Sequence, residues 1–285
     1  MANSGMSSHY TSIMSKFLIK NLDAGSKMLP YVNKQMEVEF EGGGVTAQRA
    51  KLGDVTIGNY TEGTDMTVSA VTSTSDTITM DQQKYFNFVI DTLEGLDAQK
   101  VDLVKGYMNR ADIAMAQTID THLLGKYSSV DSGNIIGADS AGIVLTASNI
   151  YGYFMDAKKM LGEDNILEYS GGKLVAVCDV DTCNLIERSD ELIHATAAGD
   201  GVVRNGYKGQ YAGFEIVQSN RIATASGVKN LMLFNSELFI DFVLRIKKVQ
   251  TYSPEKQFGT GVKGLAYYGS KVFHTTAAVV LKKAA

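Results

Sequence analysis

A stretch of 39 residues, 42–80, constrains the fold of this chain more than any other feature, because it carries too little apolar surface to bury itself. It contains six glycines and nine threonines, a composition typical of β-hairpins and their turns. Its large apolar residues mostly alternate with polar ones and are Val45, Leu52, Val55, Ile57, Tyr60, Met66, Val68, Val71, Ile78 and Met80. The alternation predicts a long hairpin with one apolar face and a turn near residues 62–65.

The apolar face of this hairpin needs a surface to cover it. A two-stranded hairpin alone is only marginally stable in water, and no helical pattern lies next to this one in the sequence. A long exposed strand pair also invites pairing with another chain. We therefore expect the hairpin to lie either across its own domain or across a neighbouring subunit.

The remaining composition is that of a globular protein. The chain has 285 residues, of which 45% are hydrophobic and 20% charged, enough for one large or two modest domains. Its most apolar segment, 231–244, is interrupted by polar residues well short of the ~20 residues of a membrane span. The first residues lack the apolar run of a signal peptide, which predicts folding in a cytoplasm. Cys178 and Cys183 are expected to be reduced.

Charge is distributed unevenly along the chain, whose net value is −4. Residues 1–36 carry four lysines against Asp23, and residues 245–285 carry eight basic residues against Glu255, so the part between them is strongly acidic. The asymmetry indicates either one surface that meets anionic material or a scattered solvated face. The chain lacks the basic cluster interleaved with aromatic residues that sequence-specific DNA binding requires.

Apolar periodicity predicts an α+β chain. The longest helix covers 97–124, with Asp97 as N-cap and Gly125 as its stop, and a second helix runs from Thr146 to Gly162. Strands from the two ends of the sequence are expected to share a sheet. The other elements that we expect are a helix at 10–28, a helix through 185–186, and strands at 36–40, 85–90, 174–177, 214–218, 231–234, 242–252, 265–268 and 271–281.

Motifs for catalysis or cofactor binding are weak. Gly259–Gly264 matches G-x-G-x-x-G, but only 21 strand-like residues follow it, so we expect a tight turn between strands rather than a nucleotide site. Asp179 and Asp181 could bind a divalent cation, but their position favours capping of a helix. The four histidines are dispersed, and no nucleophile elbow is present. We therefore expect no catalytic residue, cofactor or metal.

Three stretches resemble the major capsid proteins of tailed bacterial viruses, which share the Hong Kong 97-type fold. The middle one, Asn205–Asn220, reads N-G-Y-K-G-Q-Y-A-G-F-E-I-V-Q-S-N and is similar to a glycine-spaced run of the family's axial domain. The first runs from Thr77 to Asp91 and on into 111–124, like the return strand and spine helix of the family. The last begins at Val249 and is similar to the family's closing strands.

The resemblance implies an α+β Hong Kong 97-type capsid fold in four parts. These are an N-terminal arm (1–35), an extended loop (36–80), a peripheral domain with a long spine helix (81–139 and 240–285) and an axial domain (140–239). Contacts between subunits are expected from the loop, the arm and the axial domain. The residues that we expect to make them are Val45, Leu52, Val55, Ile57, Tyr60, Met66, Val68, Phe17, Asn205, Tyr207 and Tyr211.

The same resemblance implies a function. Many copies would form pentamers and hexamers of an icosahedral shell in the virion of a tailed phage, assembled in the cytoplasm of a bacterial host around double-stranded DNA that is held without sequence specificity. Because the arm is short, we expect a separate scaffolding protein, together with a portal and possible decoration proteins, and no membrane. Two alternatives stay open: an encapsulin-like compartment that holds cargo enzymes, and a soluble enzyme with an unrecognised site.

Overall fold

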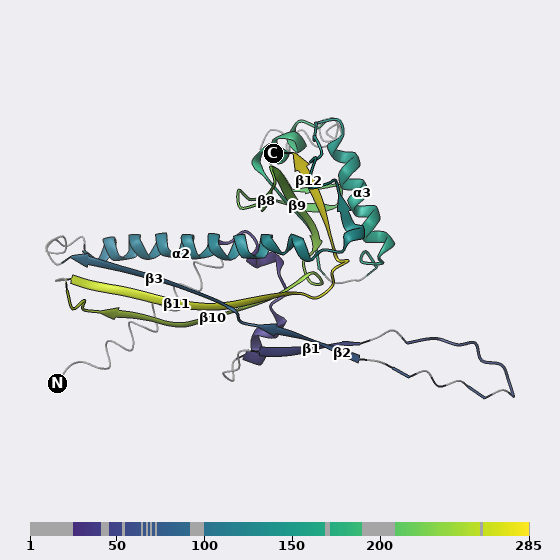
Figure 1. Ribbon diagram of the computed structural model, residues 1–285, viewed down its shortest axis with the longest axis horizontal. Helices are drawn as coiled ribbons and strands as arrows, with labels where there is room; N and C mark the ends of the chain where they lie inside the picture. The colour runs from purple at the N-terminus through teal and green to yellow at the C-terminus, as the bar shows by residue number, and fades with distance from the viewer. Residues whose placement is uncertain are drawn as a thin grey trace.

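The computed structural model has two packed regions and a projecting hairpin (Figure 1). The upper region carries the C-terminus, the lower one is long and flat, and the hairpin extends away from both. Within the part of the chain that is described, no helix has the length and apolar character needed to cross a membrane. The structure describes residues 25–40, 46–52, 55–63, 65–66, 68, 70–71, 73–91, 100–168, 172–189, 209–256 and 259–284.

The lower region is a three-stranded antiparallel sheet with a long helix along it. Its strand order is β10 (Ile240–Tyr252), β11 (Gly259–Val272) and β3 (Gln82–Asp91). The pairing of β3 with β11 joins segments from the two ends of the chain, which confirms the expected shared sheet. Helix α2 (Lys100–Leu124) runs along this sheet (Figure 1).

Helix α2 is the predicted spine helix. Its 25 residues span about 37 Å at 1.5 Å per residue. Met108, Met115, Ile119 and Leu123 recur at intervals of four and seven and are all buried, as the apolar stripe predicts. The helix ends at Leu124, immediately before Gly125, where the sequence placed its stop, whereas the expected N-cap at Asp97 lies outside the described residues.

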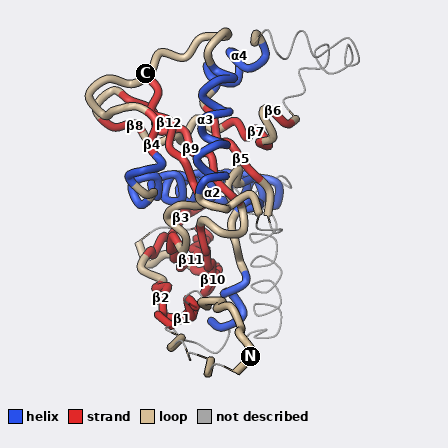
Figure 2. The backbone as a smooth tube through the Cα atoms, turned by 90° about the vertical axis from the view of Figure 1, so that its right-hand side faces the viewer, coloured by secondary structure: helices blue, strands red, loops and turns tan. Residues whose placement is uncertain are grey.

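The upper region is a seven-stranded sheet covered by helix α3 (Ile150–Glu163), with the shorter α4 (Val180–Glu187) beside it. Seen from the side, α2 lies between this sheet and the three-stranded one (Figure 2). The main hydrophobic core joins the two regions, since Phe154, Phe214 and Phe242 belong to one buried cluster. The sheet order is β4 (Ile135–Ile136), β12 (Ala278–Ala284), β9 (Val228–Asn235), β5 (Leu174–Cys178), β7 (Phe214–Gln218) and β6 (Gln210–Tyr211), with β8 (Thr224–Ala225) paired to β9.

The C-terminal strand corrects the expected domain division. The sequence assigned residues 240–285 to the lower region, yet β12 pairs antiparallel with β9 and parallel with β4 in the upper sheet. The chain leaves β11 at Val272 and turns upward before Ala278. In this position the apolar run at the start of β12, residues 278–281, is fully buried between β4 and β9.

Residues 36–40, expected as a strand, belong to the 3-10 helix η2 (Gln35–Phe40), and this prediction was wrong. Their alternation of apolar and acidic residues fits a strand, but tertiary contacts favour the tighter turn. Met36 enters a buried cluster with Val243. The carboxylate of Glu37 accepts a hydrogen bond from the backbone N–H of Leu244 on β10 (3.3 Å). The remaining 3-10 helices are η1 (Leu29–Tyr31), η3 (Gly125–Ser129) and η4 (Ser132–Asn134).

The glycine run at 259–264 lies inside β11, so the expected tight turn is wrong as well. A Cβ added at Gly261 would lie 2.5 Å from the ring of Tyr252, and one at Gly264 would lie 2.4 Å from the ring of Phe86. Both glycines therefore make room for aromatic rings on the neighbouring strands. A nucleotide-binding turn is excluded because the run opens no helix.

Candidate intersubunit surfaces

The projecting hairpin consists of β1 (Thr46–Leu52) and β2 (Ser73–Thr79), which pair antiparallel from Thr46 opposite Thr79 to Leu52 opposite Ser73. We call residues 46–79 the loop and residues 55–71 its tip. The chain reverses at Glu62–Gly63, where Gly63 has φ +82°, a backbone conformation that favours glycine. The predicted hairpin and the position of its turn are therefore confirmed.

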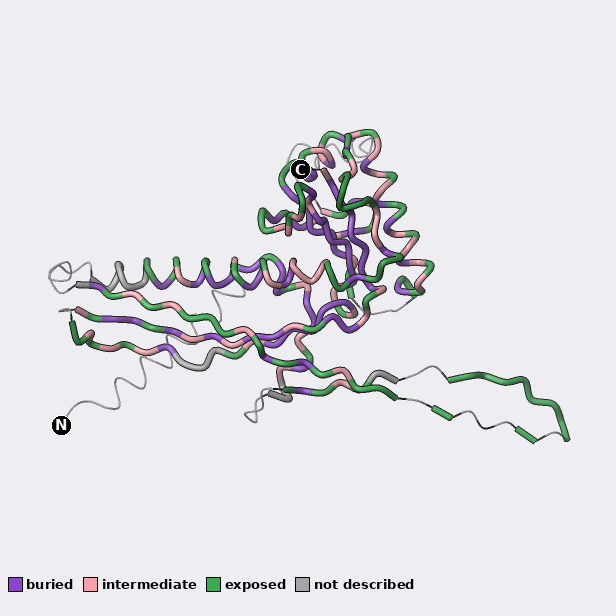
Figure 3. The backbone as a smooth tube through the Cα atoms, viewed as in Figure 1, coloured by how far each residue is buried: buried purple, intermediate pink, exposed green. Residues whose placement is uncertain are grey.

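The loop tip exposes large apolar side chains. Ile57 and Val68 are 93% and 96% exposed, and the described part of the tip is exposed throughout (Figure 3). Isolated exposed apolar residues are normal, but a group of them on one projecting segment is typical of an interaction site. The members of this group are Val55, Ile57, Tyr60, Met66, Val68 and Val71.

The base of the loop is packed against the body by a small apolar cluster. Ala47 and Ile78, which are register partners in the ladder, are buried with Met36, Met80 and Val243. Strand β11 approaches so closely that a Cβ added at Gly269 would lie 2.2 Å from the carbonyl oxygen of Thr79. The loop is thus firmly attached at its base while its tip is exposed.

A partly buried ion pair adds a second attachment. Nη1 of Arg49 donates to both carboxylate oxygens of Asp241, at 3.0 and 2.7 Å, and the guanidinium carbon lies 3.9 Å from the centroid of the Phe273 ring. Asp241 is 1% exposed. Burial raises the pKa of its carboxyl group, and the charge of Arg49 opposes that shift. We call Arg49, Asp241 and Phe273 the clamp.

The N-terminal segment is attached to the spine helix by Asp120, a buried carboxylate on α2. It accepts hydrogen bonds from the backbone N–H groups of Lys27 (3.0 Å) and Met28 (3.2 Å) and from the hydroxyl of Ser26. The point at which the expected arm joins the body is therefore fixed. Phe17, the arm residue expected to contact a neighbour, lies outside the described residues.

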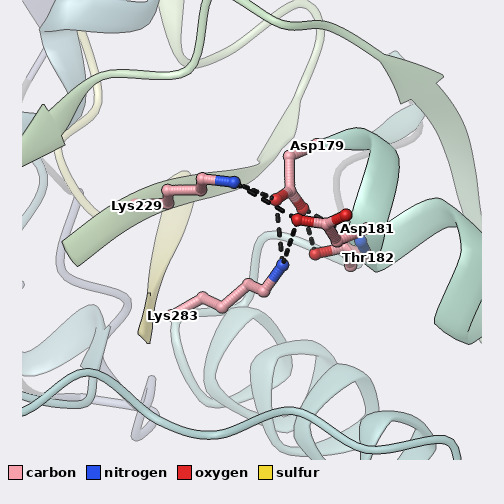
Figure 4. Close-up of polar contacts among 5 residues, drawn as sticks. All are labelled: Asp179, Asp181, Thr182, Lys229 and Lys283. Carbon is pink, nitrogen blue, oxygen red and sulfur yellow. Dashed lines mark hydrogen bonds and ion pairs between the residues drawn. The ribbon is translucent and has the colours of Figure 1, made fainter. Parts of the chain in front are cut away.

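Asp179 is the N-cap of helix α4, which confirms the predicted capping role. Its carboxylate accepts hydrogen bonds from the backbone N–H of Thr182 (3.0 Å) and from the ammonium groups of Lys229 (2.8 Å) and Lys283 (2.9 Å); Figure 4 shows both ammonium groups directed at it. Burial opposes ionisation, but these hydrogen bonds outweigh it and hold the pKa of Asp179 well below its usual range. Two lysines thus occupy the side on which a cation would bind, and the described residues contain no cluster of three potential metal ligands.

Comparisons with known proteins rest on structure alone, because neither protein-family models nor curated protein sequences give a match. A chain from a structure of Mycobacterium phage Che8 superposes with a TM-score of 0.68 at 20% identity, over 88% of both chains. The mature capsid of bacteriophage PhiM1 gives 0.63 at 16% identity, over 84% of this chain and 82% of that one. The fold is the Hong Kong 97-type capsid fold. A virus-like particle from Pyrococcus furiosus gives 0.55 at 13% identity, over 95% and 99% of the two chains.

The capsid fold accounts for the parts that the sequence distinguished. The loop corresponds to its extended loop, the three-stranded sheet with α2 to its peripheral domain, and the seven-stranded sheet to its axial domain. Five of the expected contact residues, Val55, Ile57, Tyr60, Met66 and Val68, come together on the exposed loop tip. Val45, Asn205 and Tyr207 lie outside the described residues, as does the side chain of Leu52.

Tyr211 does not fit the expectation of a contact between subunits. It is 4% exposed, and its ring makes edge contacts with Tyr151 and Phe154 on helix α3. Its position on β6, opposite Phe214 in a two-residue ladder, directs the side chain into the core of the axial domain. Aromatic residues in a glycine-spaced run can serve either in packing or in binding, and the ring of Tyr211 serves in packing.

Two lysines of the basic C-terminal segment do not lie on the exposed surface that the uneven charge led us to expect. Lys282 is paired with Asp139 (2.8 Å) and Lys283 with Asp179 (2.9 Å), and both lysines are buried. These two of the eight basic residues therefore stabilise the axial domain instead of contributing to an exposed basic surface. The clamp could not be predicted from the sequence, because Arg49 and Asp241 are 192 positions apart and no local pattern links them.

Proposed function

We propose that this chain is the major capsid protein of a tailed double-stranded DNA bacteriophage, and that it forms hexamers and pentamers of an icosahedral shell around the genome. The observation that carries the proposal is a loop whose apolar tip is exposed, on a fold shared with phage capsids over most of the chain. A role in building a shell explains why apolar side chains are held away from the body: their partner surface belongs to another copy.

In this proposal the assembly is mechanical. The tip of one copy lies over a neighbouring copy, where each buried aliphatic side chain contributes at most about 1.5–3 kcal/mol. Association and ordering offset much of this gain, so a single contact is weak. Closure of a symmetric shell makes the remaining contacts effectively intramolecular and multiplies their effect.

Other parts of the chain would serve the same assembly. The arm (1–35) extends along another neighbour, and axial-domain loops, including Asn205 and Tyr207, meet at the symmetry axis of each capsomer. A separate scaffolding protein and a portal would direct assembly in the bacterial cytoplasm, and a decoration protein could bind the finished virion. The mostly acidic middle of the chain suits a shell wall that encloses DNA without binding it tightly.

The test is the yield of shells from purified protein, counted by electron microscopy. The variant Val55→Ser, Ile57→Ser, Val68→Ser removes apolar surface from the tip without touching the base. Because about 1.4 kcal/mol changes an equilibrium constant tenfold, the association constant should fall at least about tenfold and few shells should form. The matched control Thr56→Ser, Asn59→Ser, Thr61→Ser alters polar positions of the same tip and should assemble normally. Normal shells from the first variant would contradict the proposed role of the tip.

A second candidate is a protein compartment that encloses cargo enzymes. The virus-like particle from Pyrococcus furiosus, which aligns with 95% of this chain, supports it, although its TM-score is lower than that of the chain from phage Che8. Extraction of nucleic acid from particles purified from the natural source separates the two candidates. Genome-length double-stranded DNA supports the phage capsid, whereas particles that hold only protein support the compartment. A stable monomer or dimer at every concentration would favour a soluble enzyme over both.

A further inference from the structure

The loop meets the body at two separate places on one face of its ladder. Ala47 and Arg49 lie two positions apart on β1, so their side chains point to the same face. Ala47 packs into the apolar cluster at the base, and Arg49 reaches Asp241 from a position about 7 Å farther along the strand. An apolar contact alone is non-directional and would act as a pivot. A second contact farther out fixes the direction of the ladder.

The chemistry of the clamp suits a directional contact. The guanidinium is planar, and it is held by a carboxylate in one direction and by the face of an aromatic ring in another. Arginine can satisfy both contacts at once, whereas a lysine ammonium is a point charge without a plane. The orientation of the Arg49 side chain, and with it that of β1, is therefore restricted at both contacts.

The two partners of Arg49 are themselves held in the body by backbone hydrogen bonds. Asp241 lies in β10, opposite Lys271 of β11, and its backbone forms a bridge with Asn33 on its other side. Phe273 directly follows β11, and its N–H donates to the carbonyl of Phe239 (3.0 Å). Both groups are buried where the two regions meet, so the clamp ties the direction of the loop to the packed body of the subunit.

We propose that Arg49 is a positioning residue for contact between subunits: held between Asp241 and Phe273, it fixes the direction in which the loop leaves the body. Its consequence for shell yield rests on the proposed capsid function, but the positioning itself is a property of one subunit. Loss of the clamp leaves the tip intact and its direction variable. Assembly then slows because fewer subunits present the tip where a neighbour can receive it.

The direction of the loop is measured by the distance between two spin labels in dilute, unassembled subunits. One label is placed on the ladder through Ser75→Cys, an exposed position of β2, and the other on α3 through Gly152→Cys, where an added Cβ has no atom within 4 Å. The native Cys178 and Cys183 are buried and should not react. The wild-type pair should give a single narrow distribution of distances.

Removal of Arg49 alone would leave a buried, unpaired carboxylate, so the decisive variant changes both partners. Arg49→Met should lower Tm by about 5–10 °C, and Arg49→Met combined with Asp241→Asn should recover most of that loss. Both should lose the narrow distance distribution, and both should assemble more slowly. In Arg49→Lys the narrow distance distribution should be recovered only in part. Gln48→Met, on the opposite, exposed face of β1, should behave as the wild type does.

A narrow, wild-type distribution in the stable double variant would overturn the positioning role of Arg49. A narrow distribution in Arg49→Lys would overturn the role given to the planar contact with Phe273. The proposed capsid function fails separately, if the wild-type protein forms no shells while its loop is held in one direction. The two proposals are thus tested by different measurements on the same set of proteins.

Discussion

A single buried carboxylate, that of Asp179, ties the C-terminal strand to the rest of the axial domain. Asp179 lies at the start of α4 and binds lysines from β9 and β12, which are far apart in sequence. Its neighbour Asp181 is 70% exposed and lies 3.5 and 3.8 Å from the same two ammonium groups. The pair offers an internal comparison, because the two carboxylates share their partners and differ in burial.

Asp179→Ala should destabilise the subunit strongly. It removes the cap of α4 and leaves the buried ammonium of Lys283 without its closest partner, a loss of about 3–5 kcal/mol in the free energy of unfolding. Asp181→Ala should cost less than about 1 kcal/mol, because exposed ion pairs contribute little. Urea denaturation of both variants measures the difference. Equal losses would contradict the importance of burial at this site.

The pH dependence of the same site follows from the direction of its pKa shift. The pKa of Asp179 is lower in the folded chain than in the unfolded one, so its contribution to stability is present above the unfolded pKa and is lost as the pH falls below it. The difference in unfolding free energy between the wild type and Asp179→Asn should therefore be constant from neutral pH down to about 5 and shrink below about 4. If this difference in unfolding free energy grew as the pH fell, the pKa of Asp179 would be raised on folding and not lowered.

Close backbone contacts between elements set the position of the loop. Gly269 of β11 lies against the carbonyl of Thr79, with no room for a Cβ. Gly269→Ala should therefore displace the end of β2 and destabilise the subunit by about 1–3 kcal/mol. Gly152→Ala, at an open position in helix α3, should instead stabilise it by about 0.5–1 kcal/mol. Thermal unfolding that shows the same effect for both variants would contradict the close approach.

Elements with a strong local pattern could be predicted from the sequence, and those shaped by distant contacts could not. The stripe from Met108 to Leu123 defined α2, and the alternation around Gly63 defined the loop, because both patterns lie within one element. Residues 36–40 and 259–264 were misassigned because Glu37 and Gly264 are explained by residues on other strands. The sequence left open whether the hairpin lies on its own domain or on a neighbour, and the structure shows its tip exposed. The clamp depends on a side-chain ion pair between Arg49 of β1 and Asp241 of β10 that only the folded chain reveals.

For the whole molecule, the central claim is that the apolar loop tip is exposed in one subunit because a second subunit covers it. The capsid fold supports this claim, as does the firm attachment of the loop base beside an exposed tip. Neither feature would benefit a chain that acts alone, since exposed apolar surface lowers solubility. The proposed assembly of many copies would explain the loop.

Electron cryomicroscopy of the purified protein tests this claim most directly. We expect closed icosahedral shells in which Val55, Ile57 and Val68 of each copy are buried against an adjacent copy. Shells in which these side chains face solvent, or a protein that remains monomeric at every concentration, would contradict it.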